Sequence, residues 1–318
     1  MRRLRVVFAL LASLLLILAS ACSSDSSPEA TPPEETAPET TTAGETQSGA
    51  TTGTEATTSG QLPERPFEEF DYDNFDRSTT IDNDWFPLSP GAQLVEKGST
   101  FEGGRRVRHR VVLTVTDLTK VIDTIRVVVA LERDYAADEL VETELAFFAQ
   151  DNDGNVWHLG QYPEEYENGE FVDAPAWIAG VENARAGIAM KARPRRGASS
   201  YSQGWGPAVN WRDRAQVYRM GQRTCVPVGC YEDVLVMEEF SPEEPGAFQL
   251  KYYAQGVGNV RVGWRGNDAS KEELELVKFV RLSPDALAQI RAEALKQERR
   301  AYEISTDVYG RTPPAEGP

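Results

Sequence analysis

Three cysteines have neighbours and spacings that indicate specific chemistry. Cys22 follows the small residues 19–21, an apolar run at residues 6–18 and a basic N-terminus. This order is typical of an export signal with a small-residue cleavage site. After cleavage, the thiol of Cys22 can take a diacylglyceryl group. Residues 1–22 are therefore predicted to be a lipoprotein signal peptide with lipidation at Cys22, and plain secretion or an uncleaved anchor is the alternative.

Cys225 and Cys230 flank a Val-Pro-Val-Gly segment that turns the chain back on itself. In an oxidising compartment an even number of remaining cysteines favours a disulfide, which we predict between Cys225 and Cys230. A zinc site would need two further ligands, and the chain has only His109 and His158, both in strand-like segments. The spacing also differs from a Cys-X-X-Cys redox pair. We expect neither a metal nor a cofactor.

The two histidines also limit the enzyme classes that fit. No nucleophile elbow and no Cys–His signature lies near either ring, so a Ser–His or Cys–His hydrolase is disfavoured and no catalytic residue is assigned. One enzymatic alternative stays open. Acidic and aromatic residues that could line a carbohydrate groove cluster at Glu164, Glu165, Glu167, Tyr162, Tyr166 and Trp157. The competing interpretation is an acidic loop after a hairpin.

Residues 151–155, Asp-Asn-Asp-Gly-Asn, resemble the start of a calcium loop. A full loop needs a bidentate acid about six residues after its glycine, and Gly160 stands there instead. An Asp-Gly pair between two strands is also a strong hairpin signal. A hairpin turn is favoured over calcium binding.

A basic run lies at Lys191, Arg193, Arg195 and Arg196. Such a run could bind an anionic ligand or a cell-wall polymer, and the simpler interpretation is a solvated loop.

The composition restricts the partners. The 318 residues carry a formal charge of −17, which argues against nucleic acid and against electrostatic docking on anionic lipid. Residues 23–60 contain no aromatic and no branched aliphatic side chain. This segment cannot bury apolar surface and is predicted to be a disordered Thr/Ser/Pro/Glu linker.

The rest of the chain alternates apolar and polar residues with the period of two that strands show. Residues 61–282 are predicted to form a mainly β domain, an antiparallel meander that curls into a barrel, half-barrel or sandwich. Ser283 and Pro284 then start a C-terminal helix over residues 283–303, followed by a coil tail at 304–318. A strand is predicted to start at residues 93–96, and further strands are predicted at residues 107–116, 121–133, 140–150, 155–161, 215–220, 231–240, 247–253, 259–264 and 273–282. Residues 173–213 are expected to hold short strands or a helical turn.

Four stretches resemble an uncharacterised family of exported bacterial β-rich proteins, many of them lipoproteins. They are IDNDWFPLSPGAQLVEKG, FFAQDNDGNVWHLGQYPEEYENG, AGVENARAGIAM and KYYAQGVGNVRV. The resemblance implies a β-rich extracytoplasmic domain. It carries no assigned activity and no catalytic residue.

The sequence therefore predicts a lipid-anchored β-domain on the extracytoplasmic face of the membrane, with a binding or carrier role. Val234 and Val236 alternate with Leu235 and Met237, so both strand faces are apolar and need a second layer or a cavity. The expected partners are the membrane, through lipidated Cys22, and an apolar small molecule or a cell-wall partner, but no nucleic acid. The alternative is a carboxylate-based hydrolase that acts on glycans.

Overall fold

The computed structural model describes residues 67–318. The predicted signal peptide, the lipidation site Cys22 and the predicted linker lie outside these residues. Within the described part, none of the helices has the length and apolar character needed to cross a membrane.

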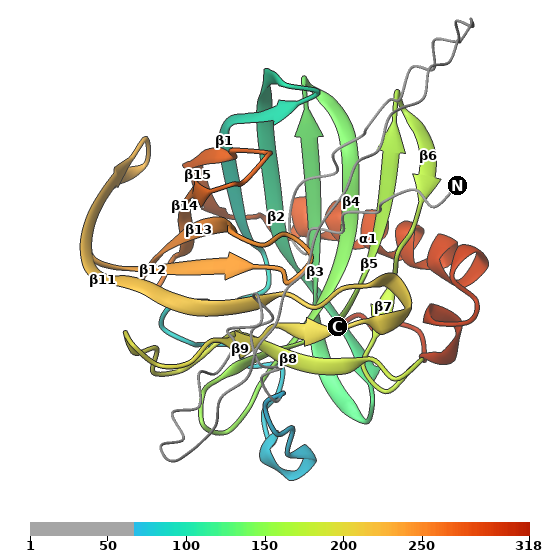
Figure 1. Ribbon diagram of the computed structural model, residues 1–318. Coiled ribbons are helices and arrows are strands. Elements are labelled where there is room, and N and C mark those ends of the chain that lie inside the picture. The colour runs from blue at the N-terminus through green and yellow to red at the C-terminus, as the bar shows by residue number, and fades with distance from the viewer. Residues whose placement is uncertain (1–66) are drawn as a thin grey trace, which may run out of the picture. The chain divides into compact units, whose positions relative to one another are not determined.

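Fifteen strands form one open antiparallel sheet in this part of the chain (Figure 1). The strands are β1 (Ala92–Glu102), β2 (Arg105–Ile122), β3 (Ile125–Ala136), β4 (Glu139–Gln150), β5 (Val156–Glu167), β6 (Glu170–Asp173), β7 (Trp177–Ile178), β8 (Arg185–Met190), β9 (Tyr201–Ser202), β10 (Gly204–Trp205), β11 (Arg214–Val226), β12 (Gly229–Phe240), β13 (Ala247–Ala254), β14 (Gly258–Gly266) and β15 (Glu273–Arg281). Their order is β10-β8-β5-β4-β3-β2-β1-β15-β14-β13-β12-β11-β9, with β6 and β7 also paired to β5. The predicted antiparallel β class is confirmed.

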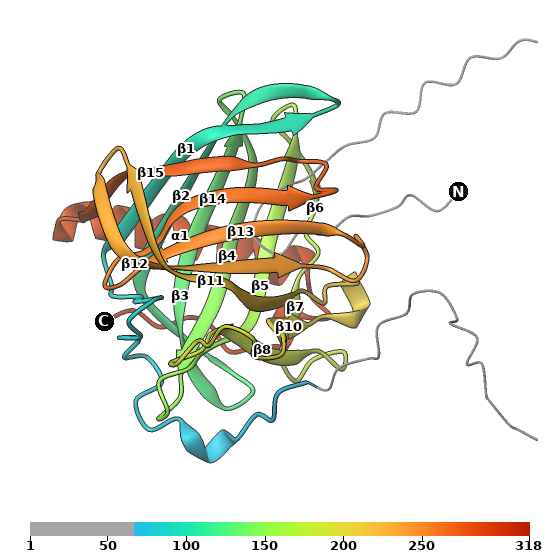
Figure 2. The same cartoon turned by 60° about the vertical axis from the view of Figure 1, so that its left-hand side comes forward.

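The pairing of β1 with β15 joins two halves of this sheet. Ala92 lies opposite Arg281, and the ladder continues to Ser99 opposite Glu273. The long strands β2 to β5 form one half, and strands β11 to β15 cross in front of them (Figure 2). The sheet therefore bends back on itself, as predicted, and its concave face lies between the two halves.

One predicted strand was wrong in its limits. Residues 121–133 were expected to form a single strand, but the chain turns at Asp123 and Thr124, which both have positive φ angles of 45° and 71°. These two residues close the hairpin between β2 and β3. The turn is hard to recognise in the sequence because valines and isoleucines lie on both sides of it, in the two apolar strands that it joins.

Helix α1 (Pro284–Ile304) covers the outer face of β2 and β4. Ser283 caps it by accepting a hydrogen bond from the backbone N–H of Ala286 at 3.3 Å, and proline occupies the first turn. Gln297 is buried and donates to the backbone carbonyl of Thr143 at 2.6 Å. The predicted C-terminal helix is confirmed.

The chain after α1 returns to the sheet and is held by Lys120. Its ammonium group is fully buried and lies 2.9 Å from the Glu298 carboxylate. It also donates to the backbone carbonyl of Pro313 at 2.5 Å. A short 3₁₀ helix, η3 (Tyr309–Arg311), precedes this contact. Lys120 thus ties β2, α1 and the C-terminal residues together on the outer face.

Residues 173–213 contain the short strands β7 to β10 and the 3₁₀ helix η2 (Pro207–Val209), as expected. A third 3₁₀ helix, η1 (Tyr72–Asn74), lies before the sheet. The indole rings of Trp177 and Trp211 stack at 4.7 Å, and both are buried. This segment is therefore packed against the sheet through its tryptophans.

We expect Gly98→Ala to destabilise the fold strongly. A Cβ atom at Gly98 would lie 1.8 Å from the backbone carbonyl oxygen of Glu273, so β1 and β15 would have to separate. The expected loss is about 3 kcal/mol in the free energy of unfolding, measured by urea denaturation. Gly263→Ala on β14 is the matched control, because its nearest neighbour would be Tyr252 Cε2 at 3.8 Å. Equal losses in the two variants would contradict the importance of this close contact.

Candidate functional site

Acidic residues lie directly opposite one another on three neighbouring strands. Glu132 on β3 is opposite Glu144 on β4. Asp134 is opposite Glu142, which is in turn opposite Glu165 on β5. We call these five residues the acidic rungs. Like charges directly opposite each other destabilise a sheet, so the arrangement needs a compensating charge or a functional reason.

The acidic rungs belong to the concave face. The rung of Glu132 and Glu144 continues to Leu113 on β2 and Leu94 on β1. Leu94, Leu113 and Glu132 line a cavity together with Lys251 from the other half of the sheet. The side chains of the rungs therefore face the interior between the two halves.

Two of these carboxylates are buried without the hydrogen bonds that burial normally requires. The exposed fraction is 1% for Glu144 and 6% for Glu132. Both carboxylate oxygens of Glu144 and the Oε1 atom of Glu132 have no hydrogen-bond partner among the described residues. Burial of an unpaired polar group costs several kcal/mol at most sites, on the order of 2–7 kcal/mol. Stability alone does not account for these two residues.

His109 neutralises one part of the concave face. Its ring is 3% exposed and lies between Asp134, which contacts Nε2, and Glu272, whose Oε1 atom is 2.7 Å from Nδ1. Burial opposes the charged ring, but the hydrogen bond to Asp134 and the ion pair with Glu272 prevail and raise the pKa of His109 to about 10. The ring is therefore a fixed cation at neutral pH and a poor general base.

Lys251 is a second buried cation on this face. Its Nζ atom lies 2.7 Å from the Glu239 carboxylate, which also accepts a hydrogen bond from Gln203 at 3.1 Å. Burial alone would lower the pKa of Lys251, but Glu239 raises it above its ordinary value. Lys251 therefore keeps its positive charge at neutral pH.

The cavity has a volume of about 60 Å³ and a mixed lining. Its polar side chains are Glu96, Glu132, Lys251 and Asn259. Its aromatic side chains are Phe86, Phe148 and Tyr253, so both halves of the sheet contribute polar and aromatic groups. This volume holds about four water molecules at roughly 15 Å³ each.

The two glutamates of the cavity titrate near neutral pH. Burial and the nearby Glu272 raise the pKa of Glu96 to about 8, while the amide of Asn259 donates to its Oε1 atom at 3.0 Å. Burial also raises the pKa of Glu132, to about 7, although Lys251 opposes the shift. Perturbed pKa values of this kind cluster at functional sites, which makes the cavity the candidate site.

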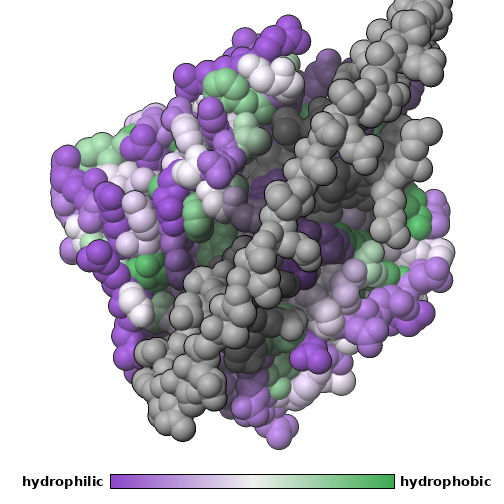
Figure 3. All heavy atoms as spheres, viewed as in Figure 1, coloured by the Kyte–Doolittle hydropathy of each residue, from purple (hydrophilic) through white to green (hydrophobic). Residues whose placement is uncertain are grey.

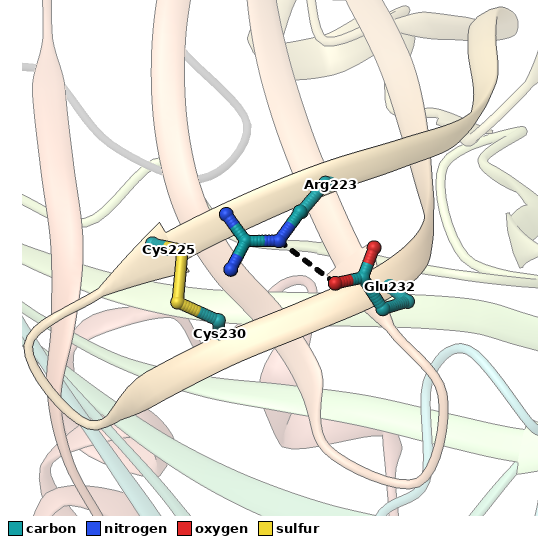
Figure 4. The surroundings of a disulfide bond; sticks show 4 residues. All are labelled: Arg223, Cys225, Cys230 and Glu232. Atoms are coloured by element: carbon teal, nitrogen blue, oxygen red, sulfur yellow. Dashed lines mark hydrogen bonds and ion pairs between the residues drawn. A yellow bond between two sulfur atoms is a disulfide. The ribbon is translucent and has the colours of Figure 1, made fainter.

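Cys225 and Cys230 are bonded through their sulfur atoms, with an S–S distance of 2.07 Å. They lie opposite each other near the end of the β11–β12 hairpin (Figure 4). An exposed ion pair, Arg223 with Glu232 at 2.8 Å, spans the same hairpin. The disulfide holds this hairpin end closed.

The acids at residues 164–167 do not converge in one groove. Glu164 is buried and accepts hydrogen bonds from the Tyr162 hydroxyl at 3.0 Å and from Arg300 of α1 at 2.9 Å. Glu165 is the next residue on β5, so its side chain points to the opposite face. The carbohydrate groove expected around these residues is therefore split between the two faces of the sheet.

The Asp-Asn-Asp-Gly-Asn motif forms the turn between β4 and β5. The Asp151 carboxylate accepts hydrogen bonds from the Asn155 backbone N–H and the Trp157 indole, both at 2.8 Å. Gly154 has a φ of 87°. These contacts fit the hairpin interpretation. Among the described residues, no group of three His, Cys, Asp or Glu side chains is arranged to hold a metal ion.

The basic run and His158 lie outside the cavity lining. The arginines of the basic run, Arg193, Arg195 and Arg196, are exposed on the loop between β8 and β9. His158 is buried, and burial lowers its pKa to about 3, so its ring is neutral. On the face seen in Figure 3, polar residues predominate around the edge and apolar residues form small groups.

The sequence reasoning missed the acidic rungs. Glu132 and Asp134 are two residues apart on one strand, and Glu142 and Glu144 are two residues apart on the strand that follows. Each pair therefore lies on one face of its strand, and a hairpin places the pairs opposite each other. Paired acids on adjoining strands were the signal that could have identified the site.

Comparisons with known proteins give little further information. No family model and no curated protein matches the chain. One solved structure, from Bacteroides fragilis, is of a protein described as exported with a YmcC-like fold; it is 16% identical, covers 62% of this chain and 98% of its own, and has a TM-score of 0.35. Another, described as a lipoprotein of Parabacteroides distasonis, is 13% identical, covers 64% and 100%, and has a TM-score of 0.36. Both descriptions name the class of exported protein that the sequence resembles. Similarities this weak do not define a shared fold.

We expect Glu132→Gln to gain stability relative to the native chain as pH rises from 5 to 8. The pKa of Glu132 is about 7 in the folded chain against an ordinary 4.5, so folding takes up a proton between these values. The stability of the native chain therefore falls as pH rises through this window, and glutamine removes the effect. The difference in unfolding free energy should grow by about 2–3 kcal/mol, measured by urea denaturation at each pH.

The exposed residue Glu139 at the start of β4 provides the control. Glu139→Gln should follow the pH dependence of the native chain, because its side chain is already in water. Parallel curves for Glu132→Gln and the native chain would contradict the raised pKa.

Proposed function

We propose that this protein is a lipid-anchored, extracytoplasmic domain that binds a small polar ligand at the cell envelope. Cys22 and the export signal before it support the anchor and the location. The bond between Cys225 and Cys230 fits an oxidising compartment, where disulfides persist. The cavity of the concave face is the proposed binding site.

One observation carries the binding role: Glu132 and Glu144 are buried, and within residues 67–318 they have side-chain oxygens that lack hydrogen-bond partners. Groups of this kind reduce the stability of a fold, and natural proteins retain them mainly where function requires them. Glu132 lines the cavity, so a ligand placed there could supply the missing partner.

The lining favours a polar ligand over the apolar one expected from the sequence. Glu96, Glu132, Lys251 and Asn259 all contribute to the cavity wall. An acyl chain placed against these groups would remove their remaining solvent and offer no hydrogen bonds in return. The aromatic side chains of the lining can also contact a short apolar part of the ligand.

Glycan hydrolysis is the second candidate function. Its two carboxyl groups would be those of Glu96 and Glu132, in place of the acids at residues 164–167. The two share a cavity with aromatic walls, and their pKa values of about 8 and 7 lie close to neutral pH. A glycosidase needs one carboxyl group that carries a proton and one that is ionised. Binding is preferred because Lys251 and Asn259 line the same cavity without a role in such a reaction.

The anchor has a direct test. Cys22→Ser should move the protein from the membrane fraction to the soluble extracytoplasmic fraction, because the hydroxyl group cannot take the thioether-linked lipid. Cell fractionation and the intact mass of the purified chain measure both effects. A variant that stays in the membrane with its lipid mass would contradict lipidation at Cys22.

The binding role has a second test on the full lipidated chain, purified in mild detergent from its native host. Native mass spectrometry should show a mass excess that disappears on denaturation and that falls at least tenfold in occupancy in Glu132→Gln. Glu139→Gln should keep it. A bare mass in every preparation would contradict the binding role. Release of new reducing ends from envelope glycans by the native chain, lost in Glu132→Gln, would favour the hydrolase instead.

A further inference from the structure

We propose that the cavity binds a protonated primary amine on a short apolar chain, with Glu132 as the counter-ion of the ammonium group. This inference rests on the proposed binding function and names the chemical class of the ligand. It follows from the charge, the lining and the volume of the cavity.

On the concave face, buried acidic side chains outnumber buried cationic side chains. The buried acids are Glu96, Glu132, Asp134, Glu142, Glu144, Glu239 and Glu272. His109 is engaged by Asp134 and Glu272, and Lys251 by Glu239. The cations of the face are therefore committed to other carboxylates.

Glu96, Glu132, Glu142 and Glu144 remain, and Glu132 is the one of these four described residues that both lines the cavity and has an oxygen without a hydrogen-bond partner. Its side chain is 6% exposed, lines the cavity, and has an Oε1 atom without a partner among the described residues. Glu144 lies directly opposite it and is also unpaired. An ammonium group beside Glu132 would form a charge-assisted hydrogen bond with this oxygen and reduce the repulsion along the rung.

The walls favour an organic cation over a metal ion. Calcium needs six to eight oxygen ligands, and the described residues contain no group of three acids, histidines or cysteines arranged to hold a metal. The aromatic side chains of Phe86, Phe148 and Tyr253 instead offer apolar contact, and aromatic rings attract organic cations.

The volume sets the size of the ligand group. A cavity of about 60 Å³ holds about four water molecules, which corresponds to about four or five non-hydrogen atoms. n-Butylammonium has this size and combines an ammonium head with an apolar tail. 1-Butanol and butyrate match its shape but differ in charge, so they are suitable controls.

Proton release is the expected signature of this contact. Around Glu132 lie Glu96 on β1, His109 on β2, Asp134 on β3, Glu144 on β4, Lys251 on β13, and Glu272 before β15. Since the pKa of Glu132 is about 7, a cation that binds beside it at pH 7 should displace roughly half a proton. A neutral or anionic ligand should displace none.

The experiment is isothermal titration calorimetry of the full chain in mild detergent at pH 7, in two buffers with different ionisation enthalpies. n-Butylammonium chloride should bind at least tenfold more tightly than 1-butanol, with proton release, and sodium butyrate should not bind. Glu132→Gln should reduce the affinity for n-butylammonium to that for 1-butanol and abolish the proton release. Glu139→Gln should change neither value. Glu144→Gln, on the opposite rung position, should weaken binding to a smaller extent.

Equal affinities for n-butylammonium and 1-butanol, or an unchanged affinity in Glu132→Gln, would overturn the proposal. A ligand captured from the native host that contains no amine would overturn it as well and leave the binding function intact. The absence of both a captured ligand and amine binding would remove the two together.

Discussion

The pairing of β1 with β15 is the contact on which the concave face depends. It joins strands from opposite ends of the folded chain, so that β2 to β5 and β11 to β14 become parts of one bent sheet. Without this ladder the two halves would not face each other, and the carboxylates of β3 and β4 would be solvated. The close approach at Gly98 shows how tightly the two strands are placed. The electrostatics of the interior thus follow from one long-range backbone contact.

The two faces of the β2–β5 half have different tasks. The outer face packs against α1, with Gln297 and Lys120 fully engaged in hydrogen bonds or ion pairs. The inner face carries Glu132 and Glu144, and in the described part of the chain Oε1 of Glu132 and both carboxyl oxygens of Glu144 have no hydrogen-bond partner. The polar groups of the outer face thus have partners and stabilise the fold. The carboxyl groups of the inner face are available to bind a ligand.

Residue alternation predicted the antiparallel class, the curl of the sheet and the C-terminal helix, because strands and helix caps have local signatures. Alternation along β4 also puts Glu142 and Glu144 on one face of the strand and Leu145 and Phe147 on the other. It could not show that both faces are buried, since burial of the glutamate face depends on β13, more than a hundred residues later. The turn at Asp123 and Thr124 was missed for a related reason, because two apolar strands flank it without a glycine or proline.

The aromatic side chains of the cavity explain how the fold can hold several acidic groups in its interior. Next to Phe86, Phe148 and Tyr253 the carboxyl groups lose solvent, and burial is the largest cause of the raised pKa values of Glu96 and Glu132. In the empty cavity these groups hold protons and do not repel each other fully. A cation that binds here competes with those protons. Because the site has lost solvent, the bound ion pair lies in a medium of low dielectric and interacts strongly. The proposed site therefore needs its apolar half as much as its charged half.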